Sequence, residues 1–82
     1  MAPRPPHRIE LDLRRQVASV IQDEIAAREL TQAQVREILN IAQPDVSYLK
    51  NGKVERFSLS QLIAHAEKLG ITLSLSMTSS RA

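Results

Sequence analysis

The side chains best suited to chemistry in this 82-residue sequence gather in one short segment around Gln43-Pro44 and Ser47-Tyr48. Residues three or four positions apart share one face of a helix, so a helix here would present all four together. A glutamine amide can pair bidentately with adenine, and a serine hydroxyl can reach either kind of base edge. The proline and tyrosine rings can pack against a thymine methyl group. The available chemistry is therefore contact with bases in the major groove of DNA.

A basic cluster follows these residues, formed by Lys50, Lys53 and Arg56. Residues 1–30 carry five arginines against five acids, whereas residues 31–82 carry six Lys or Arg against four acids. Basic side chains close to DNA displace condensed counterions, so a local cluster suits a surface that contacts phosphates. The alternative is a solvated loop that is basic without any partner.

The rest of the composition narrows the function classes. Cysteine is absent and the two histidines, His7 and His65, lie far apart, so we expect no disulfide, metal or cofactor. No nucleophile–base pair or phosphate-binding loop supports an enzyme. No apolar run is long enough to span a membrane, and the first residues lack the apolar stretch of a secretory signal, which favours a cytoplasmic protein. A single small domain of this size also favours oligomerisation.

Two short helices are predicted to position the polar segment. Thr31 is a suitable N-cap for a helix at 32–39, and Asn40 can adopt the left-handed conformation that turns the chain. Pro44 suits the start of the next helix, which Asn51-Gly52 closes. Apolar residues would brace the pair from inside: Val35, Ile38, Ile41, Val46 and Leu49. A plain helical hairpin that binds no DNA has the same periodicity.

The flanking segments complete the predicted organisation. Residues 1–12 are expected to form a flexible, basic and proline-rich arm, in which 9–13 alternates like a short strand, before a helix at 13–28. Ser58 with Gln61 forms a capping box, and Phe57 with Leu62 a hydrophobic staple, for a helix that ends at Gly70. Residues 71–77 alternate as a strand, and 78–82 form a tail. The folded domain is thus expected at 13–77.

Three stretches, at 30–34, 38–47 and 49–53, resemble the helix-turn-helix of the XRE/Cro-type repressors. The family pattern runs Leu-Thr-Gln, then Leu-Gly-Val-Ser-Gln-x-x-Val-Ser, then Asn-Gly-Lys. The Gln-Pro pair at 43–44 and the segment 56–63 more closely resemble the subgroup of HigA-type antitoxins of bacterial toxin–antitoxin operons. Asn40 replaces the family glycine, and Ala42 replaces a serine, so residue 42 cannot cap the following helix.

This resemblance implies a mainly α-helical, four- to five-helix Cro/repressor-like domain with a C-terminal β-strand. It gives the base-contacting role to four residues: Gln43, Pro44, Ser47 and Tyr48. The role of contacting the DNA backbone falls to five others: Gln32, Asn51, Lys53, Arg56 and Ser58. The helix start at Ser58 would direct backbone amides at a phosphate, as helix N-termini do.

The function expected from these features is repression of transcription by a homodimer on double-stranded operator DNA. The resemblance further implies an antitoxin that regulates its own operon and neutralises a toxin protein. A dimer interface is expected along the apolar face of 71–77: Ile71, Leu73, Leu75 and Met77. Two alternatives remain, a stand-alone or phage-type regulator and a protein-interaction module that does not bind DNA.

Overall fold

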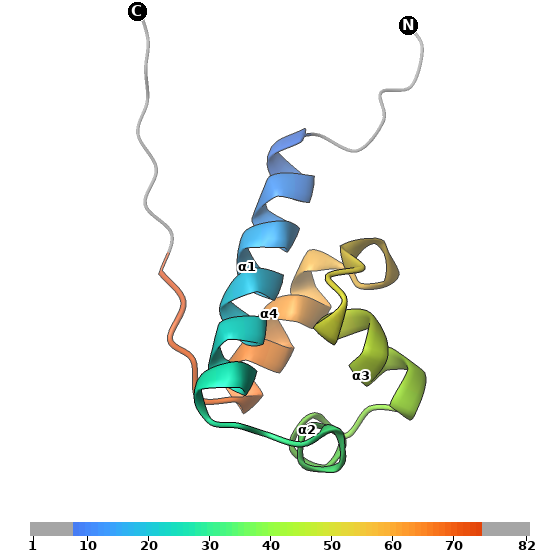
Figure 1. The fold of residues 1–82 in the computed structure, drawn as a ribbon. Coiled ribbons are helices and arrows are strands. Elements are labelled where there is room, and N and C mark those ends of the chain that lie inside the picture. Colours follow the sequence, from blue (N-terminus) through green and yellow to red (C-terminus); the bar gives the residue numbers. More distant parts are fainter. Residues whose placement is uncertain (1–7, 75–82) are drawn as a thin grey trace, which may run out of the picture.

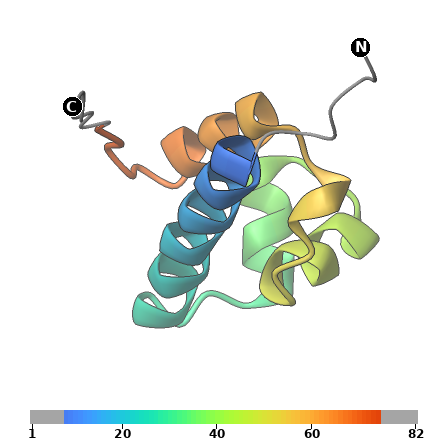
Figure 2. The ribbon, with the colours of Figure 1, turned by 90° about the horizontal axis from the view of Figure 1, so that it is seen from above.

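The computed structural model describes residues 8–74, and for Arg8 the backbone alone. Four α-helices and one 3₁₀ turn follow in order: α1 (Arg8–Ala27), α2 (Gln32–Leu39), α3 (Gln43–Lys50), η1 (Val54–Arg56) and α4 (Leu59–Lys68). In both views α2 and α3 lie on one side of α1, and the segment after α4 lies on the other (Figures 1 and 2). In this part of the chain no helix is long and apolar enough to cross a membrane.

The core lies where α1 and α4 pack against the α2–α3 pair. Helices α1 and α4 make the most extensive contact between any two elements. The largest fully buried side chains of the described residues are those of Ile21, Val35, Leu39, Val46, Leu49, Leu62 and Leu69. Each of the four α-helices thus supplies at least one of them, and this shared burial fixes the positions of the short helices.

Helix α1 begins earlier than the sequence pattern predicts. The expected strand at 9–13 is wrong, because these residues are helical, as are residues 8–12 of the expected arm. Glu10 and Arg14 form an ion pair of 3.0 Å at the i,i+4 spacing that supports a helix. Five alternating residues fit either structure, and the ion pair is compatible only with the helix. The rest of the arm, 1–7, lies outside the described residues.

The turn between α2 and α3 follows the prediction. The backbone amide of Gln34 donates to the Thr31 hydroxyl at 3.1 Å, and the backbone amide of Thr31 donates to the side-chain oxygen of Gln34 at 2.8 Å. This capping box starts α2 at residue 32, as expected for Thr31. Asn40 ends the helix in the left-handed region, with φ 55° and ψ 51°. The predicted bounds of 32–39 are therefore confirmed.

Helix α4 also starts and ends as predicted, but the strand after it is not present at 71–74. Gly70 turns the chain with φ 78°, and the amide of Ile71 donates back to Ala66 at 3.0 Å. A strand needs a partner, and the other segment that alternates like a strand, 9–13, is helical. The predicted alternation still holds at 71–74, since Ile71 and Leu73 are half-buried while Thr72 and Ser74 are exposed. Residues 75–77 lie outside the described part.

Candidate nucleic-acid interface

The outer face of α3 carries the four predicted base-contacting residues. Val46 and Leu49 bury the inner face against the core. On the opposite side, Gln43 and Pro44 are exposed, and Ser47 and Tyr48 are half-buried. The sequence-predicted set therefore forms one surface on one helix.

Gln43 and Gln32 join the start of α3 to the start of α2. The Gln43 Nε2 group donates to the Gln32 Oε1 atom, and both residues are exposed. An amide group has two N–H donors and a carbonyl with two lone pairs. The bond to Gln32 uses one donor, so Gln43 keeps the donor and the acceptor that a bidentate pair with adenine requires.

Tyr48 and Arg56 form a second joined pair at the other end of α3. The guanidinium carbon of Arg56, in η1, lies 4.4 Å from the centre of the Tyr48 ring. A cation over an aromatic face is attracted by the ring quadrupole. One face of the ring is therefore covered by Arg56, and the half-buried side chain also packs against the core.

The five predicted backbone-contacting residues are all exposed, and they lie at the starts of α2 and α4 and in the segment that follows α3. Gln32 lies at the start of α2, and Asn51 follows α3 and donates to the Ser47 hydroxyl at 3.4 Å. Lys53 directly precedes η1, Arg56 is the last residue of η1, and Ser58 precedes α4. Their placement fits contact with the phosphates on either side of a groove, which stays a prediction.

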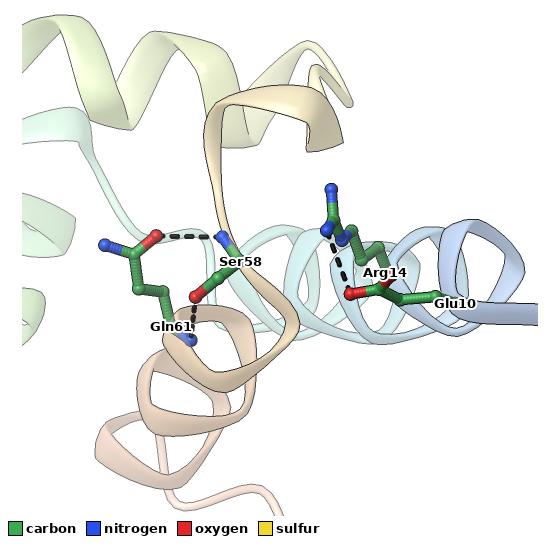
Figure 3. A network of polar contacts seen from close by, with 4 residues as sticks. All are labelled: Glu10, Arg14, Ser58 and Gln61. Atoms are coloured by element: carbon green, nitrogen blue, oxygen red, sulfur yellow. Dashed lines mark hydrogen bonds and ion pairs between the residues drawn. The ribbon is translucent and has the colours of Figure 1, made fainter. Parts of the chain in front are cut away.

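Figure 3 shows that the capping box at the start of α4 occupies both polar groups of Ser58. The Ser58 hydroxyl accepts from the Gln61 amide at 3.1 Å, and the Ser58 amide donates to Gln61 Oε1 at 2.8 Å. The first-turn amides of Leu59 and Ser60 have no partner within the helix. A phosphate at this helix start would therefore meet those two amides and not the amide of Ser58.

His65 belongs to the core. It is buried, its ring meets Phe57 edge-on with centroids 5.8 Å apart, and its Nδ1 atom has no hydrogen-bond partner. Burial lowers the pKa of His65, the nearby charge of Lys68 lowers it further, and Asp45 opposes both effects. These surroundings are those of a packing side chain.

A groove of about 410 Å³ opens between α1 and the end of α3. It is lined by Gln22, Ile25, Ala26, Glu29, Leu30 and Lys50. None of the nine predicted DNA contacts lines it, so the outer face of α3 and this groove are separate surfaces.

Sequence reasoning missed two kinds of contact. Gln34 closes the capping box of α2, and the Thr-x-x-Gln spacing was a signal that could have identified it. Gln22 in α1 donates to the carbonyl groups at the end of α3, 27 residues away along the chain. No local pattern indicates the second contact, because it depends on how α1 and α3 pack.

Comparison with known proteins agrees with this geometry. The family described as a helix-turn-helix domain matches residues 4–78. A solved structure named "Putative XRE Family Transcriptional Regulator" is 30% identical to this chain, with a TM-score of 0.79. The alignment covers 89% of this chain and 85% of that one. This chain is an XRE-type helix-turn-helix protein.

The helix-turn-helix of this XRE-type protein consists of α2, the turn at Asn40 and α3. Helix α3 takes the place of the second helix of the motif, the one that enters the major groove in DNA-binding members. No curated protein is significantly similar to the chain. The finer resemblance to HigA-type antitoxins stays a prediction.

Proposed function

We propose that this protein is a sequence-specific DNA-binding regulator of transcription that acts as a repressor, with α3 in the major groove. The observation that carries the proposal is the outer face of α3, where the four polar or ring-bearing side chains lie together within a border of exposed DNA-backbone candidates. Membership of the helix-turn-helix family and the likeness to an XRE-family transcriptional regulator support it. The same membership favours a binding protein over an enzyme.

In this proposal Gln43 and Gln32 act together. Gln32 contacts a phosphate and holds the amide of Gln43 through the hydrogen bond between them. The remaining donor and acceptor of Gln43 face adenine, which offers N7 as acceptor and N6 as donor. At the other end of α3, Tyr48 supports Arg56 beside a phosphate.

Two substitutions separate base contact from phosphate contact. Gln43→Ala should weaken binding to a duplex selected from a random pool by roughly 1–3 kcal/mol and relax the preference at one position. Lys53→Ala should weaken all duplexes alike and reduce the slope of log affinity against log salt by about one. Gln16, exposed on α1, provides the control substitution Gln16→Ala. Wild-type protein that binds no duplex would instead favour the protein-interaction module.

We propose a homodimer in which the segment 71–77 of one chain pairs with its copy across a two-fold axis. The alternation of half-buried Ile71 and Leu73 with exposed Thr72 and Ser74 supports this, since it continues the pattern of a strand with one apolar face. Leu75 and Met77 continue the alternation in the sequence. A dimer would place two recognition helices about 34 Å apart, one DNA turn, on a pseudo-palindromic site.

The double substitution of Leu73 and Leu75 by Asp tests this interface. Monomer in sedimentation, with most helical signal kept and operator binding lost, is the expected result. A double variant that stays dimeric would place the interface on α1 or α4.

The finer proposal is that the protein is the antitoxin of a toxin–antitoxin module and regulates its own operon. The support is the sequence resemblance at 43–44 and 56–63. Co-expression with the protein encoded by the neighbouring gene should give a stable complex and relieve growth inhibition by that protein. A neighbour without toxicity, or without binding, would favour a stand-alone regulator.

A further inference from the structure

Gln22 makes a contact that the proposed function does not use. Its Nε2 atom donates to the Leu49 carbonyl at 2.8 Å and lies 3.5 Å from the Lys50 carbonyl. Gln22 is half-buried on α1, and both acceptors belong to the last turn of α3. This contact therefore ties the long helix to the end of the proposed recognition helix.

The last turn of α3 offers backbone carbonyl groups that can accept hydrogen bonds from outside the helix. The last carbonyl groups of a helix have no partner within the helix. Here the amide of Lys53 returns to the Tyr48 carbonyl at 2.9 Å and that of Gly52 to the Leu49 carbonyl at 3.2 Å, a Schellman closure. Gln22 supplies a further donor to Leu49, whose oxygen can accept two bonds.

Gly52 makes room for this side chain. Its φ of +71° is the left-handed region, and a Cβ atom there would lie 3.3 Å from the Nε2 atom of Gln22. A larger residue at position 52 would have a strained backbone and would also crowd the side-chain amide of Gln22. The turn after α3 and the Gln22 contact therefore depend on each other.

We propose that Gln22 is a positioning residue that fixes the axial placement of α3 for DNA recognition. The inference rests on the proposed function, since it concerns how the outer face of α3 is presented. Val46 and Leu49 set the depth of α3 by apolar packing, which has little directional preference. Ala42 provides no side-chain cap at the other end of the helix. A directional hydrogen bond from Gln22 limits sliding and rotation that packing alone permits.

The chemistry of the amide defines the test variants. Gln22→Met keeps the approximate length and loses the donor. Gln22→Glu places an acceptor, with negative charge, against carbonyl oxygens at the negative end of a helix dipole. Gln22→Lys restores a donor with a favourable charge. Gln16→Met is the matched control, because Gln16 is exposed on the same helix.

The measurements are the affinity for a duplex selected from a random pool, the affinity for an unrelated duplex, and amide hydrogen exchange. At a temperature where every variant is folded, Gln22→Met should lower selected-duplex affinity about three- to tenfold, as the loss of one hydrogen bond would. Binding to the unrelated duplex should change less than about twofold, because it depends on phosphate contacts. Exchange at 49–53 should quicken, Gln22→Glu should lose more affinity, and Gln22→Lys should recover part of it.

Selected-duplex affinity and exchange equal to those of Gln16→Met would overturn the inference. Equal losses on both duplexes, in proportion to a lower melting temperature, would overturn it too, because they indicate stabilisation alone. Absence of DNA binding by the wild-type protein is a distinct result that would refute the proposed function, and this inference with it.

Discussion

Helices α3 and α4 are similar in length but are held in different ways. The start of α4 is fixed by its own residues, since Ser58 and Gln61 bond reciprocally within one turn. Helix α3 starts after Ala42, which makes no side-chain cap, and has Pro44 in its first turn. Its end is held from α1 by Gln22.

The difference shows where the placement of each helix comes from. A capping box depends on residues adjacent in the sequence and defines a helix start before any packing occurs. Helix α3 instead depends on neighbours, through its buried Leu49 and through the stack of Tyr48 with Arg56. Of these two helices, α4 begins at a cap that its own residues form, whereas α3, the helix proposed to contact DNA, begins without one.

The largest expected effect comes from removing the apolar anchor of α3. Leu49→Ala should lower the free energy of unfolding by about 2–5 kcal/mol, because Leu49 is fully buried and truncation leaves a cavity. Urea denaturation measures the loss. Leu62→Ala in α4 is the matched comparison, and only Leu49→Ala should also speed amide exchange throughout α3. Equal exchange of α3 in both variants would show that the two helices are held alike.

A smaller effect should follow from removing the local cap of α4. Ser58→Ala should lower the free energy of unfolding by about 1 kcal/mol, because it leaves the backbone amide of Gln61 without its acceptor. Thermal unfolding measures the change, with Ser60→Ala, at an exposed position within the first turn, as the control. A melting temperature equal to that of the control would mean that the capping box does not fix this helix start.

Giving α3 a cap should raise stability modestly. Residue 42 already has the extended backbone of an N-cap, with φ −75° and ψ 156°. Ala42→Ser should therefore add roughly 0.5–1 kcal/mol, since serine at this position accepts from a first-turn amide. Ala33→Ser, exposed within α2, should give no such gain. An unchanged or lower melting temperature for Ala42→Ser would indicate that α3 needs no local cap.

The smallest effect is a dependence of stability on pH through His65 in α4. Burial, aided by Lys68, lowers the pKa of His65 from 6.5, so the folded protein binds a proton less readily than the unfolded chain. Stability should therefore be full above about pH 6.5 and fall as the pH drops through the lowered pKa. Chemical denaturation at several pH values measures it, and His65→Gln should flatten the curve in that range. A wild-type curve as flat as the variant curve would contradict the prediction.

Sequence patterns identified the helix-turn-helix and the composition of the candidate surface. Thr31, Asn40 and Ser58 act through neighbours within four positions, so their roles could be predicted without the fold. The predicted strands failed where the outcome depended on a partner. Residues 9–13 are part of α1, and within the described residues 8–74 the segment 71–74 pairs with no strand.

The sequence by itself determined where α2 and α4 begin, because their caps form within one turn. Only the tertiary structure decided how the helix ends are satisfied. The carbonyl groups of Leu39, Leu49 and Leu69 accept from side chains that lie far away along the chain. Those donors are Lys68 at 3.2 Å, Gln22 at 2.8 Å and Arg28 at 2.6 Å. The separations along the chain are 29, 27 and 41 residues. An unpaired carbonyl at a helix end accepts any donor that packing brings close, so no local pattern specifies which residue provides it.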